Sequence, residues 1–145
     1  MDSRSEAPCA LITGFRGFTG GYLAKVLEGA GYRIFGTAHG AEPIGPGVFA
    51  VDLCDPKAVV QLIDQIRPTV VVHLAAISFV AHNDVDAIYR VNVVGTRNLL
   101  AALATLDTPP RCVLIASSAN IYGNAAVELV DESIAPSPAN DYAVS

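Results

Sequence analysis

The sequence predicts an α/β protein of the Rossmann type, with a doubly wound parallel sheet and helices on both faces. Short apolar runs alternate with stretches of helical spacing, an order typical of parallel strands joined by helices. The first run leads directly into a glycine-rich turn that opens a helix. The chain has 145 residues, 52% of them apolar, which is enough for one core. We therefore interpret residues 1–145 as one dinucleotide-binding domain.

The expected order of elements is β-α-β-β-α-β-α-β. Uninterrupted runs rich in Val, Ile and Leu predict strands covered on both faces. Apolar residues three and four apart predict helices. The expected strands are 9–13, 33–38, 48–51, 69–74 and 111–116, and the expected helices are 18–27, 56–67 and 84–105.

Two helices have a predicted apolar face. In the first, Gly29 and Gly31 are expected to end the helix, and its face is expected to hold Tyr22, Leu23, Val26 and Leu27. The second begins with Asp55 as N-cap and Pro56 at the first helical position. Its face is expected to hold Val59, Leu62, Ile63 and Ile66.

Composition excludes several function classes. Nine Lys and Arg against fourteen Asp and Glu give a net charge of −5, and the basic residues do not cluster, so a nucleic-acid partner is not expected. No apolar run approaches about 20 residues, so no membrane span is expected. Residues 1–6 lack the apolar region of a secretory signal.

The three cysteines are widely spaced and form no C-x-x-C motif. Neither a disulfide framework nor a metal site is therefore indicated, and a reducing, cytoplasmic setting is the default expectation. We expect these side chains to act as small buried hydrophobes. They are Cys9, Cys54 and Cys112.

The glycine-rich turn predicts a phosphate-binding loop. Gly14 permits the tight turn, Gly17 lets the backbone approach a pyrophosphate, and Gly20 lets the helix pack closely. The N-terminus of the helix offers unpaired N–H groups to the anion. The alternative is that these glycines serve only a tight turn.

The end of the second strand bears on the choice of dinucleotide. An acidic residue there would accept hydrogen bonds from the ribose hydroxyls of NAD, but residues 36–39 contain no acidic residue. Arg16 in the loop and His39 after the strand add positive charge that could accommodate a 2′-phosphate. The sequence therefore favours NADP over NAD, with a solvated Arg16 as the alternative.

Asp52 and Leu53 follow the third strand at the same edge of the sheet. Asp52 could accept a hydrogen bond from the adenine amino group while Leu53 packs on the ring. The alternative is an ordinary helix-capping acid, a role that Asp55 already fills.

Six ordered motifs together resemble one family, the extended short-chain dehydrogenases/reductases, also called the NAD-dependent epimerase/dehydratase family. Most members act on nucleotide sugars. The motifs are Thr13-Gly14-x-x-Gly17-Phe18-x-Gly20, Asp52-Leu53, His73-Leu74-Ala75-Ala76, Asn92-x-x-Gly95-Thr96, Ser117-Ser118-x-x-x-Tyr122-Gly123 and Tyr142-Ala143-Val144-Ser145.

The resemblance implies a set of site residues and no metal. Asn92 would hydrogen-bond near the end of the fourth strand, and His73 is read as a core histidine and not as a ligand. With the residues discussed above, the expected cofactor-binding set is Gly14, Phe15, Arg16, Gly17, Phe18, Thr19, His39, Asp52, Leu53, Leu74, Ala75, Ala76, Asn92 and Ala116. The expected substrate-binding set is Ser78, Ser118, Asn120 and Tyr142.

Ser118 and Tyr142 are the catalytic residues that the resemblance implies. Tyr142 would move a proton to or from a sugar oxygen while Ser118 hydrogen-bonds that oxygen. Alone, Ser118 could merely finish a strand and Tyr142 could be a packing aromatic. The family's lysine, four residues after the tyrosine, would fall just beyond Ser145. We therefore expect this chain to be the N-terminal part of a longer enzyme and to be inactive by itself.

The choice of reaction depends on two departures from the family pattern. Dehydratases carry an acid just after the catalytic hydroxyl, whereas Ser118 is followed by Ala119-Asn120. Epimerases that retain NAD keep the acid after the second strand, which is missing here. The expected activity is a 4-ketoreductase of a GDP-4-keto-6-deoxy-hexose, similar to the GDP-4-keto-6-deoxy-mannose reductases. The alternatives are a UDP-glucose-type 4-epimerase, then a 4,6-dehydratase, and, from another class, a non-catalytic dinucleotide sensor.

The resemblance also implies a homodimer. Family members commonly pair the helix expected at 84–105 with the helix that follows the catalytic tyrosine, so this helix is expected to contribute to a subunit interface.

Overall fold

The structure is a computed structural model that describes residues 7–40, 45–79, 83–125 and 129–145. The expectation about a secretory signal concerns residues 1–6, which lie outside the described residues.

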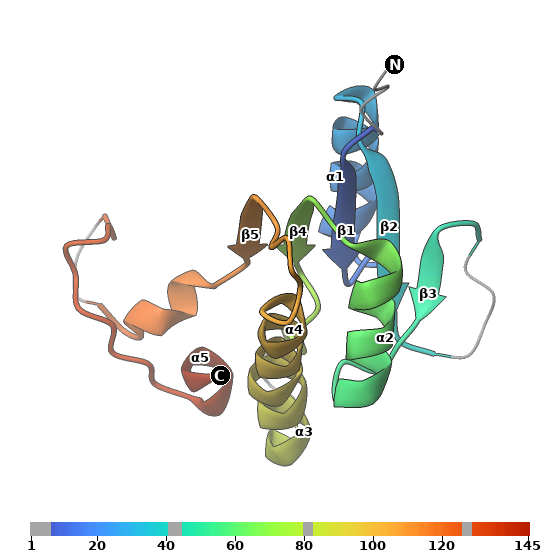
Figure 1. The fold of residues 1–145 in the computed structure, drawn as a ribbon. Coiled ribbons are helices and arrows are strands. Elements are labelled where there is room, and N and C mark those ends of the chain that lie inside the picture. Colours follow the sequence, from blue (N-terminus) through green and yellow to red (C-terminus); the bar gives the residue numbers. More distant parts are fainter. Residues whose placement is uncertain (1–6, 41–44, 80–82, 126–128) are drawn as a thin grey trace, which may run out of the picture.

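Five parallel strands form one sheet in the order β3-β2-β1-β4-β5 (Figure 1). The central strand β1 pairs with β2 on one side and β4 on the other, so the strand order reverses between β1 and β4. This order confirms the predicted Rossmann-type fold and places a topological switch point at the carboxyl edge. The strands are β1 (Cys9–Thr13), β2 (Arg33–Ala38), β3 (Val48–Ala50), β4 (Val70–His73) and β5 (Cys112–Ile115).

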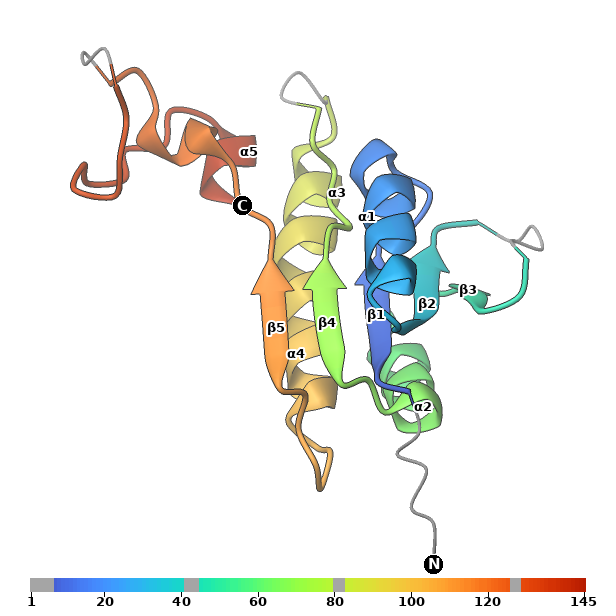
Figure 2. The same cartoon turned by 90° about the horizontal axis from the view of Figure 1, so that it is seen from above.

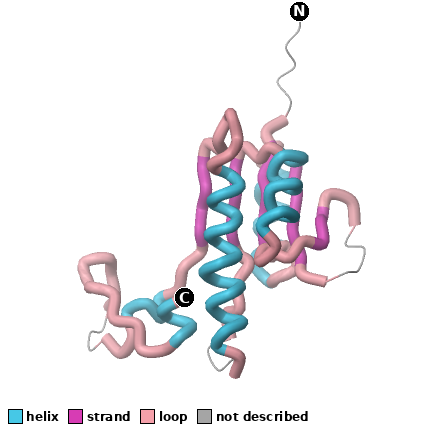
Figure 3. The backbone as a smooth tube through the Cα atoms, turned by 60° about the horizontal axis from the view of Figure 1, so that its bottom comes forward, coloured by secondary structure: helices cyan, strands magenta, loops and turns pink. Residues whose placement is uncertain are grey.

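Helices lie on both faces of the sheet. The helix α1 covers one face, and α2 with the long helix between β4 and β5 covers the other (Figure 2). Figure 3 shows that long helix as one continuous rod, although its middle is a π-helical turn. The bounds are α1 (Phe18–Gly29), α2 (Pro56–Ile66), α3 (Val85–Tyr89), the π-helical η1 (Arg90–Gly95) and α4 (Thr96–Leu103).

Two short helices lie beyond the carboxyl end of β5. They are the 3₁₀ helix η2 (Ala119–Tyr122) and α5 (Asp141–Val144). The π-helical turn of the long helix was not predicted from the sequence. In the part of the chain that the structure describes, no helix has both the length and the apolar character needed to cross a bilayer.

The main core lies between the sheet and the helices α2 and α4. The predicted face of α2 is confirmed, since all four of its residues are buried. Asp55 caps that helix as expected, because its Oδ1 accepts hydrogen bonds from the backbone N–H groups of Lys57 and Ala58. Burial of each large aliphatic side chain contributes roughly 1.5–3 kcal/mol. This core fixes the β1–β4 pair, on which the site described below is built.

The predicted apolar face of α1 is wrong for two of its four residues, whereas Leu23 and Leu27 are half-buried. Tyr22 and Val26 are 63% and 67% exposed, while Gly20 and Ala24 are the buried residues of this helix. The physical reason is a very close approach to the phosphate loop, because a Cβ on Gly20 would lie 2.6 Å from the carbonyl oxygen of Phe15. Small residues therefore face the sheet, and the helix continues to Gly29 and does not end at Leu27.

The strand β5 and two of the cysteines also differ from expectation. All four residues of β5 are exposed, because β5 is an edge strand of this sheet. The three cysteines are free thiols, of which Cys9 is buried, Cys54 is half-buried and Cys112 is exposed. Only Cys9 is thus a buried hydrophobe as predicted.

Candidate functional site

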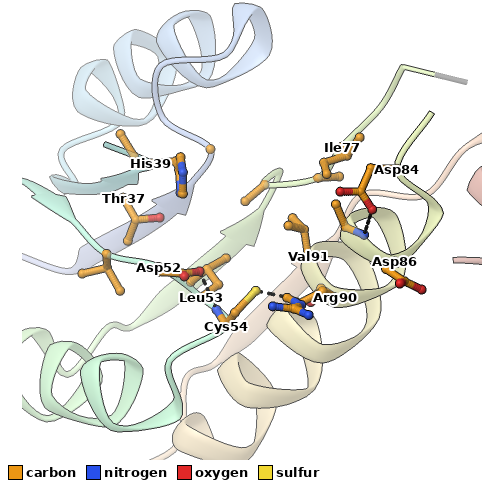
Figure 4. Close-up of a pocket in the computed structure, with 16 residues that line it drawn as sticks. Thr37, His39, Asp52, Leu53, Cys54, Ile77, Asp84, Asp86, Arg90 and Val91 are labelled. Atoms are coloured by element: carbon orange, nitrogen blue, oxygen red, sulfur yellow. Dashed lines mark hydrogen bonds between the residues drawn. The ribbon is translucent and has the colours of Figure 1, made fainter. Parts of the chain in front are cut away.

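Two cavities open at the carboxyl edge of the sheet. The larger, of about 690 Å³, lies between the phosphate loop, the ends of β2 and β3, and the start of the long helix (Figure 4). The smaller, of about 340 Å³, extends past the ends of β4 and β5 to α5. Ala75 and Ala76, which follow β4, line both cavities. A ligand that crosses these two residues would therefore occupy both.

The phosphate loop needs glycine for steric reasons. Gly14 has a φ of +68°, and a Cβ there would lie 2.8 Å from the backbone nitrogen of Ala75. The N–H of Gly17 donates to the carbonyl of Gly14 at 2.9 Å, which closes the turn before α1. The loop thus brings bare backbone and the N-terminus of α1 to the rim of the larger cavity, an arrangement that fits a pyrophosphate.

The adenosine residues expected from the sequence gather in the larger cavity. His39, Asp52 and Leu53 all line it. The Oδ1 of Asp52 also accepts a hydrogen bond from the N–H of Cys54 at 2.8 Å, so the functional and the turn-capping interpretations are compatible. Among the described residues that line this cavity, β2 and the turn after it supply Thr37, Ala38 and His39, none of which is acidic.

Sequence reasoning missed Cys54 and Arg90, which also line the larger cavity. The Sγ of Cys54 lies 3.4 Å from the carbonyl oxygen of Arg90. Burial raises the pKa of the Cys54 thiol, and the hydrogen bond and the negative charge of Asp52 act in the same direction. The raised pKa favours the protonated thiol, which is a weak hydrogen-bond donor. The rule that ligands bind outside the carboxyl ends of strands would have pointed to Cys54, which follows β3, but not to Arg90, which lies within the long helix.

Several predicted cofactor residues lie outside the linings of the two cavities. The ring of Phe15 packs on β2, because a Cβ on Gly36 would lie 2.5 Å from it. Phe18 is 84% exposed, and its ring centroid lies 5.0 Å from that of Tyr22. Neither ring lines a cavity. The residues in question are Phe15, Arg16, Gly17, Phe18 and Thr19.

The smaller cavity brings together the predicted catalytic and substrate residues. Ser118 comes from the loop after β5, and Tyr142 comes from α5. Asn120 does not line the cavity, but its Nδ2 donates to the Oγ of Ser118 at 3.0 Å. The other predicted residues on this lining are Leu74, Ala75, Ala76, Ser78, Asn92 and Ala116. Their roles in binding and catalysis stay predictions.

Asn92 joins the loop after β4 to the helix that carries Tyr142. Its Oδ1 accepts from the N–H of Ile77 at 2.8 Å, and its Nδ2 donates to the carbonyl of Ile77 at 3.2 Å. The same Nδ2 donates to the Oγ of Ser145 at 2.9 Å, and Ser145 in turn donates to the carbonyl of Tyr142 at 2.9 Å. The hydrogen bonds that the resemblance implied for Asn92 are thus present.

His73 is a satisfied core histidine, as predicted. It is 3% exposed, and its ring nitrogens lie 2.6 Å from the Oγ1 of Thr13 and 2.8 Å from that of Thr96. Burial lowers the pKa of His73, so the neutral imidazole is favoured. Across the described residues, no cluster of three or more His, Cys, Asp or Glu side chains could hold a metal ion.

Comparisons of the sequence with known proteins identify a family and a relative. The model of the NAD dependent epimerase/dehydratase family matches residues 10–145. A protein of Aggregatibacter actinomycetemcomitans named GDP-6-deoxy-D-talose 4-dehydrogenase is 35% identical over 136 residues, which is 93% of this chain and 44% of that protein. The chain thus spans less than half the length of this relative.

Solved structures show the same fold. A putative epimerase from Burkholderia cenocepacia J2315 is 47% identical with a TM-score of 0.84, over 94% of this chain and 46% of that one. A UDP-glucose 4-epimerase from Brucella ovis in complex with NAD is 30% identical with a TM-score of 0.83, over 95% of this chain and 44% of that one.

Two neighbouring glycines of α1 test the role of the phosphate loop. Gly20→Ala places a Cβ 2.6 Å from backbone oxygen, so the loop must shift, and we expect dinucleotide affinity to fall about tenfold or more. Gly21→Ala is the matched control, because a Cβ there meets open space. It should stabilise the helix by up to about 1 kcal/mol and leave affinity unchanged. Titration calorimetry and urea unfolding measure both effects, and equal affinities of the two variants would contradict this prediction.

Proposed function

This chain belongs to the NAD dependent epimerase/dehydratase family, and from that premise we propose that the protein is an NAD(P)-dependent nucleotide-sugar oxidoreductase. The specific activity that we propose is the reduction of a 4-keto sugar, with a GDP-4-keto-6-deoxy-hexose as the substrate.

The observation that carries the proposal is that the two cavities share two lining residues. The larger cavity has the glycine turn and the adenosine-type residues, and the smaller has the hydroxyls of Ser118 and Tyr142. Ala75 and Ala76 line both. A dinucleotide whose adenosine half lies in the larger cavity would thus bring its nicotinamide end toward the two hydroxyls.

The chemistry then divides between cofactor and protein. The reduced dinucleotide supplies a hydride when it is bound. Tyr142 donates its hydroxyl proton to the keto oxygen, and Ser118 hydrogen-bonds the same oxygen, so the carbonyl becomes a secondary alcohol. The bond from Asn120 to the Oγ of Ser118 fixes the orientation of that serine. Asn92 holds α5, and with it Tyr142, against the end of β4.

Two observations favour reduction at carbon 4. The relative with 35% identity is named as a 4-dehydrogenase of a GDP-6-deoxy sugar, and hydride transfer at that carbon is a 4-keto reduction when it runs in reverse. The turn after Ser118 is Ala119-Asn120, which has no carboxylate to expel water. This turn argues against a 4,6-dehydratase, although relatives with that name are 29% identical.

A 4-epimerase is the second candidate. Structural neighbours named UDP-glucose 4-epimerase contain NAD, and a relative of that name is 35% identical over 94 residues. An epimerase would interconvert UDP-glucose and UDP-galactose with no net oxidation of added NADPH. A ketoreductase would consume one NADPH for each sugar, so the stoichiometry separates the two.

We expect the whole protein to contain further catalytic and substrate-binding residues besides those of this chain. The resemblance implies a lysine four residues after Tyr142 and a further substrate-binding part. It also implies a homodimer through the long helix, whose exposed apolar side chains include Val93 and Leu100. Light scattering on the full-length protein tests the dimer, and a monomer at micromolar concentration would contradict it.

Tyr142→Phe in the full-length protein separates an enzyme from a dinucleotide sensor. We expect turnover of a GDP-4-keto-6-deoxy sugar to fall a hundredfold or more, roughly the contribution of a positioned general acid, while cofactor affinity stays the same. Tyr32→Phe is the control, because its hydroxyl contacts Arg111 far from the cavities. A wild-type protein without turnover on GDP- and dTDP-linked keto sugars would favour the sensor.

His39→Asp tests the preference for NADP. His39 lines the larger cavity after β2, where a carboxylate would accept ribose hydroxyls and repel a 2′-phosphate. We expect the ratio of kcat/KM with NADPH to that with NADH to fall roughly tenfold, the effect of one charge-assisted hydrogen bond. Steady-state kinetics with both cofactors measure the ratio. A ratio below one in the wild type would overturn the preference.

A further inference from the structure

The buried imidazole of His73 takes no part in the chemistry proposed above, yet it lies between the strands that form the site. His73 is the last residue of β4, and the backbone that follows it, Leu74 and Ala75, lines the cavities. Its ring contacts Thr13 at the end of β1 and Thr96 at the start of α4. The imidazole thus connects the phosphate loop, the end of β4 and the long helix.

The hydrogen bonds of Thr13 decide which nitrogen of His73 bears the hydrogen. The Oγ1 of Thr13 accepts from the N–H groups of Leu74 and Ala75, both at 3.1 Å. A hydroxyl has two lone pairs and one hydrogen, so these two N–H groups point at its acceptor positions, and the N–H of Leu74 is shared with the backbone carbonyl of Thr13 at 3.3 Å. The hydroxyl hydrogen of Thr13 is then donated to the Nδ1 of His73, 2.6 Å away, and that nitrogen bears no hydrogen.

The bonds of Thr96 give the same answer independently. Its hydroxyl donates to the backbone carbonyl of Asn92 at 2.5 Å. The contact of 2.8 Å between Thr96 and His73 must then run from the Nε2–H of the ring to the oxygen of Thr96. Both ends of the imidazole thus specify one neutral tautomer, with the hydrogen on Nε2.

Thr13 connects this tautomer to a crowded part of the site. The two N–H groups that it holds belong to Leu74 and Ala75, and a Cβ on Gly14 would lie 2.8 Å from the nitrogen of Ala75. A shift of a few tenths of an ångström in this backbone would therefore move the phosphate loop or the cavity wall.

We infer that His73, as the neutral Nε2–H tautomer, is a positioning residue for the cofactor. Its Nδ1 accepts a hydrogen bond from the Thr13 hydroxyl, and Thr13 in turn holds the backbone of Leu74 and Ala75 beside Gly14. The inference rests on the proposed function, because it takes a nicotinamide dinucleotide as the ligand. It adds a residue on the lining of the smaller cavity that acts on the cofactor through Thr13.

Protonation of His73 would disrupt this arrangement. A hydrogen on Nδ1 would face an oxygen of Thr13 whose lone pairs are already used, so one of the three bonds would be lost. Among the described neighbours, β1 and α4 present Thr13 and Thr96, β5 presents Ile115, and the titratable group on the same cavity is Tyr142. Burial is the cause that lowers the pKa of His73.

The lowered pKa of His73 determines how cofactor affinity changes with pH. An ordinary histidine titrates near pH 6.5, and a lowered pKa means that the fold favours the neutral ring. The contribution of His73 is then complete above about pH 6.5 and is lost as the pH falls through the lowered value. Cofactor affinity should fall over the same range.

A matched pair of variants in the full-length protein tests the inference. In His73→Asn the amide oxygen can replace Nδ1 as acceptor for Thr13, whereas His73→Gln places its amide near Nε2 and leaves Thr13 without that acceptor. Loss of one hydrogen bond predicts a Kd for NADPH that rises about three- to tenfold in His73→Gln and stays within about twofold in His73→Asn. Urea unfolding should show similar losses of stability in both. Thr13→Val should behave as His73→Gln does, and Thr13→Ser should restore binding.

Several outcomes would contradict the inference. One is a Kd for NADPH that rises equally in the two His73 variants, in proportion to their loss of stability in urea, because that result indicates a packing role. Another is a fall in cofactor affinity below pH 6.5 that is the same in the wild type and in His73→Asn, because that variant has no imidazole to protonate. A nitrogen NMR spectrum with the hydrogen on Nδ1 would also overturn it, without any ligand. If the wild type binds neither NADPH nor NADH, the proposed function fails together with the inference, whereas wild-type binding that the variants match contradicts the inference alone.

Discussion

The backbone of Gly14 packs directly against the backbone of Leu74 and Ala75, and the geometry of both cavities depends on that contact. A single Cβ at Gly14 would come within 2.8 Å of the nitrogen of Ala75. The contact joins the central strand β1 to its neighbour β4 at the switch point of the sheet, where an open α/β sheet leaves a crevice. The core beneath α2 and α4 includes Leu11 of β1 and Val71 of β4, which are paired in the sheet, and so supports the strands that carry the glycine turn and the cavity wall.

The long helix between β4 and β5 connects the two halves of the site. Arg90 and Val91, in its π-helical turn, line the larger cavity, whereas Asn92 lines the smaller one. Thr96, one turn later, reaches His73. Single π-helical turns often lie at functional sites, and here consecutive residues of one such turn serve different cavities. Asn92 then extends the connection through Ser145 to the helix that carries Tyr142.

Most of the fold could be predicted from the sequence because strand and helix periodicities are local properties. The face of α2 followed from spacing alone, and its cap at Asp55 followed from an acidic residue directly before Pro56. The face of α1 did not, because Gly20 and Ala24 are buried by the close approach of that helix to the phosphate loop, while Tyr22 and Val26 remain exposed. Exposure of β5 likewise depends on its position at an edge, which only the sheet order reveals.

The sequence by itself determined the Rossmann-type order of elements, the glycine turn, and the residue types that a dinucleotide and a keto sugar would need. These are encoded in short motifs, whose chemistry can be read without knowing what surrounds them. Only the tertiary structure decided which groups meet: that Cys54 and Arg90 line the same cavity as Asp52, and that Phe15 and Phe18 line neither cavity. It also decided the tautomer of His73, because Thr13 and Thr96 are 60 and 23 residues distant along the chain and only the fold brings them to one ring.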